Sequence, residues 1–526
     1  MGIFLNPTND KFAIALNSSI YVDKTTLIAF TNRVLATEQR YVCVNRPRRF
    51  GKSMAANMLT AYYSRGCDSK KMFQNLAIAD CKNFETYLNK YDVIMLNMQE
   101  FLSRTQNVEK MLDRLKRMVV RDLVKEYPDA DYFDTEDVIQ SMQDVYVETG
   151  KPFIIIIDEW DCVLREYKTD FEAQKNYLDF LRDFLKDKGY IHLVYMTGIL
   201  PIKKYGTHSA LNMFDEYSMT NPGPLAEYVG FTAKEVEELC LQYGMDYEET
   251  KHWYDGYRFG EDIHIYSPRS VVSAMLNRQF DNYWNQTESF EALKIYIEMN
   301  FDGLRDSVIE MMAGAELPID IRNFKNDMTT FHGYEDVLTL LIHLGYLAYD
   351  FENQEVFIPN YEISGEFKTA LQGAGWDAVV KAVDESEQLL RNTWNKRADL
   401  VAEALGQMHL TTSILTYNDE NSLSCVVALA YYSARIYYTE IRELPTGEGY
   451  ADIVYLPRKN HLDKPAMIIE LKWDKSSKGA IEQIKERKYG KALEEYSGNL
   501  LLVGINYDRK TKVHECIIEE DRKLED

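Results

Sequence analysis

Residues 44–53 read Val44-Asn45-Arg46-Pro47-Arg48-Arg49-Phe50-Gly51-Lys52-Ser53, and this stretch decides the fold. A strand-like run, Arg40–Val44, comes before it, and a helix-like run, Lys52–Ser64, begins inside it. A tight loop between a strand and a helix presents backbone N–H groups at the positive end of the helix dipole, where they hold phosphate. The stretch therefore predicts a phosphate-binding loop.

Three residues of the loop carry the expected chemistry. Gly51 lets the backbone approach phosphate without a Cβ in the way. Lys52 reaches the β and γ phosphates of ATP, and Ser53 offers its hydroxyl to Mg²⁺. The general pattern has a glycine five places before Gly51, where this chain has Arg46, so the match is incomplete. Pro47 is a candidate to fix the turn that this glycine normally permits.

A second motif, Phe153-Ile-Ile-Ile-Ile-Asp158-Glu159, follows about a hundred residues later. Its apolar, β-branched run predicts a strand buried on both faces. Asp158 at the strand tip is expected to hold Mg²⁺ through water, and Glu159 to polarise the attacking water. Thr197 ends another apolar run and is a candidate to sense the γ-phosphate. The full set expected around ATP is Arg46, Pro47, Arg48, Arg49, Phe50, Gly51, Lys52, Ser53, Asp158 and Thr197.

Strand-like and helix-like segments alternate outward from these motifs. Tyr91–Leu96 and His192–Met196 complete the expected strands, and residues 107–126 and Phe171–Asp187 are expected helices. Such alternation predicts an α/β fold, a parallel sheet covered by helices.

The alternation of strand-like and helix-like segments ends at Asn221-Pro-Gly-Pro224, a cluster of residues that break regular secondary structure. Helical segments follow, such as Thr232–Tyr243 and Glu288–Met299. From about residue 406 the order is helix, strands and helix: Ser422–Ala434, Ile453–Leu456, Ala466–Leu471, Lys478–Lys491 and Leu500–Ile505. We predict three domains: 1–220, 221–405 and 406–526.

The last segment carries a second group of polar residues. Asp452 and Glu470 lie at apolar strands, and strand alternation puts Glu470 and Lys472 on one face. Two carboxylates on adjacent strands suit Mg²⁺ or Mn²⁺. A lysine beside them can orient water and stabilise a phosphate in the transition state. We expect the group at a solvent-facing strand end, with Gln483 on the next helix as a buttress and Glu420 as a further metal ligand or a simple helix N-terminal charge.

Composition limits the classes of function. The chain has 526 residues and a net charge of −23, whereas proteins that hold nucleic acid by bulk electrostatics carry a basic excess. Any nucleic-acid contact is therefore expected to be local, through patches and metal ions. No run reaches the roughly 18 apolar residues of a membrane helix, and the N-terminus does not resemble a signal peptide. We expect a cytoplasmic protein with no membrane contact.

Several further stretches resemble one bacterial family, the AAA-ATPase-like proteins with a C-terminal PD-(D/E)XK nuclease-superfamily domain. Besides the two motifs above, they are Ile20-Tyr-Val-Asp-Lys-Thr25, Trp253-Tyr-Asp-Gly-Tyr257, Ile265-Tyr-Ser-Pro268, Leu344-Gly-Tyr346, Ile358-Pro-Asn360 and Glu443 through Asp452 with Glu470-Leu-Lys472 and Gln483. The resemblance implies a P-loop, RecA-like αβα core, a helical lid and a restriction-endonuclease-like α/β domain.

The leading hypothesis is an ATPase coupled to a Mg²⁺- or Mn²⁺-dependent nuclease acting on DNA or RNA. Its expected catalytic residues are Glu159, Asp452, Glu470, Lys472 and Gln483, and its expected metal ligands are Ser53, Asp158, Glu420, Asp452 and Glu470. The alternative is a signalling or interaction protein, switched by ATP, whose nuclease-like domain binds a partner without cutting. The sequence leaves DNA against RNA open, and it leaves room for a homo-oligomer.

Overall fold

The fold is described from a computed structural model. It covers residues 2–521 except 203, 206–207, 210, 261, 285–288, 300, 302, 326–327, 372–376, 412–419, 447–448 and 487–497. For 204–205, 208–209, 289–292, 377–379, 410–411, 420–422, 425, 443–446 and 449–452 the backbone alone is described. The chain forms two compact units, Met1–Thr287 with Pro318–Ile363, and Glu288–Leu317 with Ser364–Asp526.

The first unit is built on a five-stranded parallel sheet in the order β2-β3-β4-β1-β7. Four of its strands come from the apolar runs that the sequence identifies as strands, and their residues are almost all buried. The strands are β1 (Tyr41–Asn45), β2 (Asp92–Asn97), β3 (Phe153–Asp158), β4 (Ile191–Gly198) and β7 (Asp215–Tyr217).

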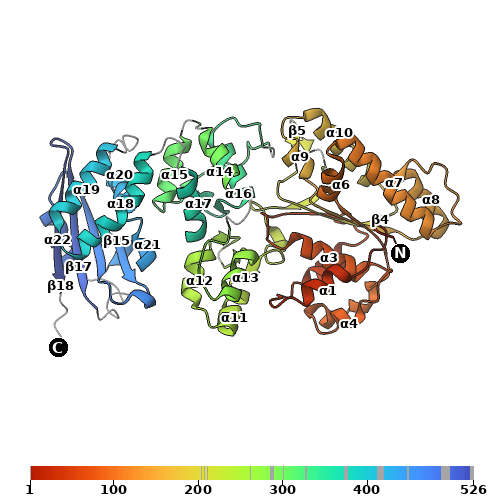
Figure 1. Cartoon of the computed structure of the whole chain (residues 1–526), viewed down its shortest axis with the longest axis horizontal. Helices are drawn as coiled ribbons and strands as arrows, with labels where there is room; N and C mark the ends of the chain where they lie inside the picture. Colours follow the sequence, from red (N-terminus) through yellow and green to blue (C-terminus); the bar gives the residue numbers. More distant parts are fainter. Residues whose placement is uncertain are drawn as a thin grey trace. The chain divides into compact units, whose positions relative to one another are not determined.

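Helices cover both faces of this sheet. Figure 1 shows α1, α3 and α4 on one side and α6 to α10 on the other, which gives the three-layer αβα arrangement. The helices up to this point are α1 (Asp10–Leu16), α2 (Thr26–Val34), α3 (Lys52–Tyr63), α4 (Lys70–Phe73), α5 (Phe84–Tyr87), α6 (Met98–Thr105), α7 (Val108–Glu126), α8 (Val138–Thr149), α9 (Cys162–Glu166) and α10 (Phe171–Leu185).

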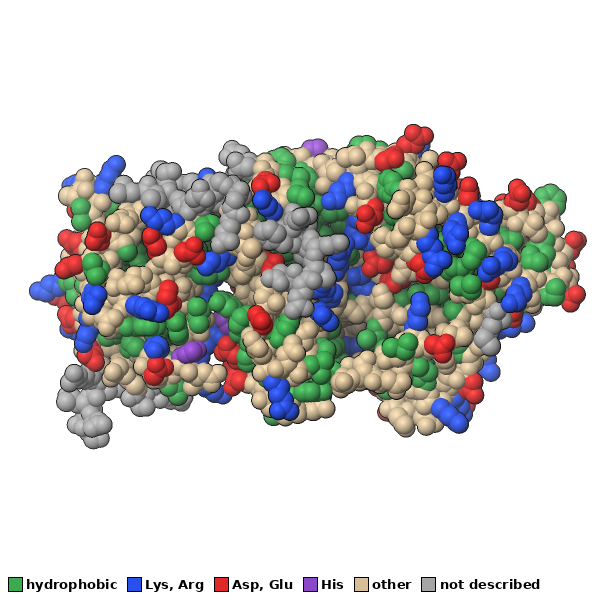
Figure 2. Space-filling model, in the orientation of Figure 1, with side chains coloured by type: hydrophobic (Ala, Val, Ile, Leu, Met, Phe, Trp, Pro, Cys, Tyr) green, Lys and Arg blue, Asp and Glu red, His purple; other side chains and the backbone are tan. Residues whose placement is uncertain are grey.

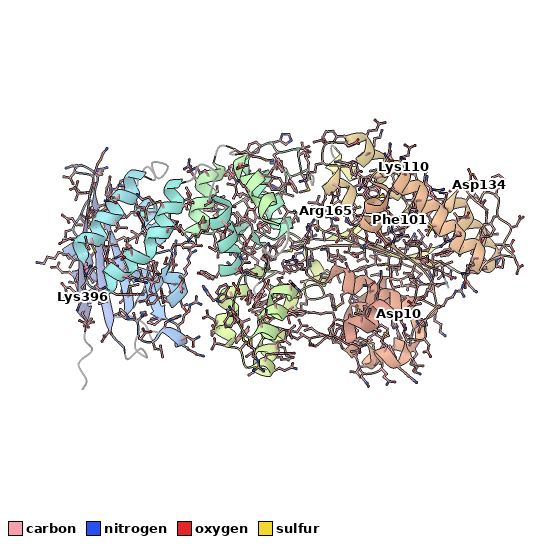
Figure 3. All side chains as sticks on the ribbon, viewed as in Figure 1. Asp10, Phe101, Lys110, Asp134, Arg165 and Lys396 are labelled. Carbon is pink, nitrogen blue, oxygen red and sulfur yellow. The ribbon has the colours of Figure 1, made fainter. Side chains whose placement is uncertain are left out.

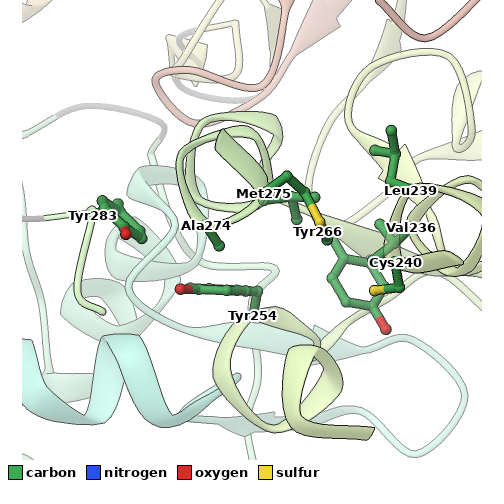
Figure 4. Close-up of a cluster of buried hydrophobic side chains, with 9 residues drawn as sticks. Val236, Leu239, Cys240, Tyr254, Tyr266, Ala274, Met275 and Tyr283 are labelled. Atoms are coloured by element: carbon green, nitrogen blue, oxygen red, sulfur yellow. The ribbon is translucent and has the colours of Figure 1, made fainter. Parts of the chain in front are cut away.

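A smaller helical part of the same unit has its own core. Three aromatic side chains, Tyr254, Tyr266 and Tyr283, pack in this core with Cys240 and the aliphatic side chains of two helices (Figure 4). Its elements are α11 (Ala233–Tyr243), α12 (Tyr247–Tyr254), α13 (Pro268–Asn277) and the sheet β8-β10-β9 (Phe231–Thr232, His264–Tyr266, Tyr257–Arg258); α16 (Tyr334–Leu344) and the sheet β11-β13-β12 (Leu317–Pro318, Glu355–Phe357, Ala348–Asp350) follow later in the chain.

The second unit contains a five-stranded mixed sheet in the order β14-β15-β16-β17-β18, in which only β16 and β17 run parallel among the described strands. Ile468 and Leu502 of this sheet pack against Ile481 of α22. The elements are α14 (Ser289–Glu298), α15 (Leu304–Met312), α17 (Tyr361–Leu371), α18 (Asp377–Trp394), α19 (Ala398–Thr411), α20 (Glu420–Ala430), α21 (Ala434–Tyr437), β14 (Tyr438–Thr446), β15 (Gly449–Pro457), β16 (Ala466–Trp473), α22 (Ser477–Glu486), β17 (Leu500–Asp508) and β18 (Val513–Asp521).

The predicted α/β fold class is confirmed, and the named strands and helices of the described residues lie within a few residues of their predicted bounds. The predicted end of the helix Lys478–Lys491, residues 487–491, lies outside the described residues. Among the helices of the described residues, none is long and apolar enough to cross a membrane. The predicted domain boundaries stay predictions, since the compact units follow a different division of the chain.

Candidate functional site

The phosphate-loop candidate is positioned by the start of α3. Gly51 caps this helix with a φ of +96°, in the left-handed region that residues with a Cβ avoid. The helix therefore begins at Lys52, directly after a sharp turn, and its first N–H groups point into the loop. An anion there meets the positive end of the helix dipole.

Lys52 folds back into the loop that it follows. Its ammonium nitrogen donates to the Pro47 carbonyl at 2.8 Å, and its side chain is buried. Burial lowers the pKa of Lys52, while the charges of Glu159, Asp161 and Asp158 act in the opposite direction. The lysine thus lies between the loop and a group of carboxylates.

Arg46, which replaces the usual glycine, supports the loop from inside the protein. Its guanidinium is fully buried and donates to the carbonyls of Asn45 at 3.0 Å and Tyr217 at 3.2 Å. It also lies over the ring of Phe259 at 4.9 Å, and burial lowers its pKa to about 10. Arg46 therefore supports the position of the loop, and its predicted direct contact with ATP stays a prediction.

The other loop residues contact the helical part of the unit. Arg49 donates to the carbonyl of Trp284 at 3.2 Å, and the ring of Phe50 meets that of Tyr257 edge-on at 5.3 Å. Arg48 is exposed. Since Tyr257 belongs to the Trp-Tyr-Asp-Gly-Tyr motif, this motif has a structural role in holding the loop.

Three polar side chains meet at the carboxyl ends of neighbouring strands. The register pairs Asp158 with Asn97 on one side and with Thr197 on the other. Asn97 donates to one oxygen of Asp158 at 3.3 Å, and Thr197 donates to the other at 3.4 Å. Asp158 is only 1% exposed, so these two donors orient a carboxylate that is sheltered from water. The predicted neighbourhood of Asp158 and Thr197 is confirmed, whereas Ser53 lies exposed on α3.

Glu159 has an unusual backbone conformation, and its side chain forms an ion pair. Its φ is +57°, in the left-handed region, and its carboxylate pairs with the guanidinium of Arg165 on α9. Burial raises the pKa of Glu159, against the lowering effects of Arg165 and Lys52. The same arginine contacts Asp161 at 3.1 Å, and Asp161 accepts from the backbone N–H of Leu200 at 2.9 Å. Arg165 therefore ties the end of β3 to the segment after β4.

Sequence reasoning missed Asn97 and Arg165. Asn97 directly follows the apolar run Tyr91–Leu96, so its place at a strand tip was a usable signal. Arg165 stands four residues after Asp161 in a helical stretch, a spacing that permits an ion pair but does not specify Glu159 as the second partner.

The second unit brings together part of the C-terminal candidate site. Lys472 donates to Glu470 at 2.9 Å, so the predicted shared face is confirmed. Glu470 and Lys472 are 1% and 8% exposed, so the expectation of a solvent-facing site is wrong for these two residues. They are buried because β16 is an inner strand of the sheet and α22 packs against the sheet at the neighbouring strand β17. The packing is close, since a Cβ added at Gly504 of β17 would lie 2.5 Å from the Ser477 carbonyl oxygen of α22.

Asp452 lies on β15, next to β16. The register pairs Ile453 with Ile469, and one more step along it brings the Asp452 backbone opposite Glu470. Gln483 is half-buried on α22, and Glu420 begins α20. The side chains of Asp452 and Glu420 lie outside the described residues. Within the described residues no group of three or more His, Cys, Asp or Glu side chains is arranged to hold a metal ion, so the ligand set stays a prediction.

Two family models match separate parts of the chain. A family model described as "Predicted AAA-ATPase" matches residues 9–207, and one for the PD-(D/E)XK nuclease superfamily matches residues 418–516. The first match contains the phosphate loop, Asp158 and Glu159, and the second contains Asp452, Glu470 and Lys472. No curated protein matches the chain.

Two solved structures from Aeropyrum pernix are also similar to this chain. The ORC2 protein, in ADPNP and ADP complexes, has 11% identity and a TM-score of 0.22 over 69% of this chain and 93% of that one. The ORC1 protein, in complex with DNA, has 11% identity and a TM-score of 0.25 over 72% of this chain and 99% of that one. TM-scores this low carry no conclusion about function.

Proposed function

We propose that this chain, which joins an AAA-ATPase-like domain to a PD-(D/E)XK nuclease-superfamily domain, hydrolyses ATP in the first and cuts nucleic acid phosphodiesters in the second. One observation carries the ATPase half. The side chain of Lys52 lies inside a helix-capping loop and faces Asp158 and Glu159, which follow one another at the end of β3.

ATP binding follows from the loop and the start of α3. The backbone N–H groups after Gly51 and the ammonium of Lys52 are donors that suit the β and γ phosphates. The hydroxyl of Ser53 and the carboxylate of Asp158 are hard oxygen ligands that suit Mg²⁺, which would neutralise charge on the phosphates. Asn97 and Thr197 orient Asp158 through its two oxygens.

Hydrolysis needs a base for the attacking water, and Glu159 is the candidate. Its raised pKa favours proton acceptance, because a stronger base draws the proton from water more readily. In this structure Arg165 holds the carboxylate in an ion pair. Thr197, on the next strand tip, is the candidate to contact the γ-phosphate.

Phosphodiester cleavage is proposed for Asp452, Glu470 and Lys472. The two carboxylates would hold Mg²⁺ or Mn²⁺, which lowers the pKa of bound water and so supplies a nucleophile. Lys472 is close enough to Glu470 to orient that water or to stabilise the charge that develops on phosphate. Gln483 and Glu420 remain candidates for support of the site.

The two halves are tested separately on the full chain. ATP hydrolysis is measured with Lys52→Ala and Glu159→Gln: the first is expected to lose tight binding, and the second to bind ATP without turnover. Tight ATP binding by Lys52→Ala would refute the phosphate loop. Cleavage of plasmid, linear duplex DNA and RNA is measured with Mg²⁺ or Mn²⁺, with and without ATP, against Lys472→Ala.

A second candidate function is an ATP-driven switch whose C-terminal domain binds a partner without cutting. The net charge of −23 favours this switch, because a protein that holds nucleic acid by bulk electrostatics needs an excess of cationic residues. Metal binding that depends on Asp452, with no cleavage of any substrate in that set, would support the switch.

A further inference from the structure

Helix α7 has two very different faces. Its inner face packs into the first unit through Met111, Leu115, Val119 and Leu123, all buried. The opposite face carries five cationic residues at steps of four, three, four and four along the chain. We call this set the basic stripe, and its members are Lys110, Arg114, Arg117, Arg121 and Lys125.

The steps place the basic stripe on one line along the helix. At 3.6 residues per turn, the five side chains lie within a sector of roughly 80°. At 1.5 Å per residue they span about 22 Å, so that one positive charge follows the next every 5–6 Å. Figure 2 shows Lys and Arg side chains gathered over the surface that α7 forms in Figure 1, and Lys110 is labelled in Figure 3.

The charges of the basic stripe are scarcely used inside the protein. Among the described residues, Lys110, Arg114, Arg117 and Lys125 form no ion pair, and Arg121 has one with Asp122 at 3.3 Å. Of the four acidic residues of α7, Asp122 also accepts from the backbone of Phe4, and Glu126 pairs with Arg65. The other two, Glu109 and Asp113, are exposed to one side of the basic stripe.

We propose that the basic stripe of α7 binds the phosphate backbone of double-stranded nucleic acid. The surface belongs to the ATPase-like unit, so it is separate from the nuclease-like site and would give the chain a second contact with its substrate. The proposal takes the class of ligand from the proposed function, but it requires neither ATP hydrolysis nor cleavage.

Regular spacing favours a nucleic acid over an acidic protein surface. A duplex offers negative charge at even intervals along its axis, and a straight row of cations can neutralise several phosphates and release their counterions. Carboxylates on a protein surface are not generally spaced in this way. The helix itself contains no Phe, Tyr or Trp on which unpaired bases could stack, so the duplex is favoured over a single strand.

The test measures binding of a fluorescent 30-base-pair DNA duplex, and of the matching RNA duplex, to the full chain by anisotropy. EDTA is present and ATP is absent, so that neither cutting nor nucleotide state contributes. The stripe variant is Lys110→Glu with Arg117→Glu and Arg121→Glu. The control is Lys11→Glu with Lys71→Glu and Lys82→Glu, which makes the same change of charge at scattered, exposed positions of the same unit.

Five phosphate contacts give a plot of log affinity against log salt with a slope of about −4.5. That slope corresponds to a loss of roughly 500-fold between 50 and 200 mM salt. With three contacts removed, the slope is expected to become shallower, with a magnitude of about 2 or smaller, while the control keeps the wild-type slope. Equal loss in both variants would show a general charge effect and overturn the proposal.

Four further results complete the test. Unchanged duplex binding by the stripe variant overturns the proposal, as does tighter binding of poly-glutamate or of single-stranded DNA than of either duplex. Equal thermal unfolding and ATP turnover of the stripe variant and the wild type establish that the fold is intact. Stripe-dependent binding without any nuclease activity would support this surface and count against the proposed nuclease, so the two failures are distinguishable.

Discussion

Replacing Arg165 by Met is expected to move the acid limb of the ATPase pH profile. Arg165 is the ion-pair partner of Glu159, the proposed base, which is active only when ionised. Burial already raises the pKa of Glu159, so the wild-type limb is expected above the ordinary glutamate value. Since the positive charge of Arg165 opposes that rise, its removal raises the pKa further and shifts the limb to higher pH.

The magnitude follows from the geometry of the pair. An opposite charge within about 4–6 Å lowers a carboxylate pKa by roughly 1–3 units. The Glu159 side chain is 23% exposed and Lys52 remains nearby, so solvent and the second cation weaken the effect. We therefore expect a shift of about 1–2 pH units, which corresponds to about 1.4–2.7 kcal/mol.

The assay is kcat/KM for ATP hydrolysis between pH 5 and 9. Arg165→Lys keeps the charge and is expected to keep the limb near its wild-type position. Arg182→Met removes an exposed arginine from α10 and is the matched control. Titration of the ATP phosphates is common to all the proteins and cancels in the comparison. A limb that does not move in Arg165→Met would mean that Glu159 is not the titrating base.

The other predictions concern the two sites and the stability of each unit. Lys52→Ala is expected to weaken ATP binding by about 10–100-fold in calorimetry, the loss of a charged hydrogen-bond donor. Asp452→Asn is expected to weaken Mn²⁺ binding by at least about tenfold, and unchanged binding would refute the site. Gly256→Ala, with φ +121° and a new Cβ 2.0 Å from the Pro359 carbonyl, is expected to lower the melting temperature or prevent folding. Burial lowers the pKa of His409 and His514 to about 4, so the second unit should lose stability as the pH falls from 6.5 towards 4. The loss at pH 5 is about 2 kcal/mol for His514, the more buried of the two. The melting temperature of a variant with Gln at both positions should depend less on pH over this range.

Burial explains which parts of the fold could be predicted. The inner strands β1, β2, β3 and β4 are covered on both faces, so their residues are apolar runs that local pattern alone identifies. The edge strand β7, Asp-Glu-Tyr, has no such pattern, because one flank is open and its side chains are polar and partly exposed. Sequence reasoning therefore missed it.

The candidate sites divide in the same way. Lys52, Asp158 and Glu159 sit in local motifs whose chemistry depends on neighbours in the chain, so their positions could be predicted. Arg46 and Arg165 act through partners fixed by the fold: Tyr217 is far along the chain from Arg46, and the pair of Arg165 with Glu159 forms because α9 turns back on β3. No spacing rule gives such contacts.

The net charge of −23 predicts that any contact with nucleic acid is local, and the basic stripe is a local surface of this kind. At physiological ionic strength the Debye length is about 8 Å. The charges behind the total of −23 are spread over the whole chain, so most of them are screened from a ligand on α7. A row of five cations about 22 Å long exceeds that length nearly threefold, and a polyanion lying along it feels mainly those five charges. An acidic chain can therefore hold nucleic acid on one helix, and the salt slope of binding, rather than the net charge, decides how many phosphates it holds.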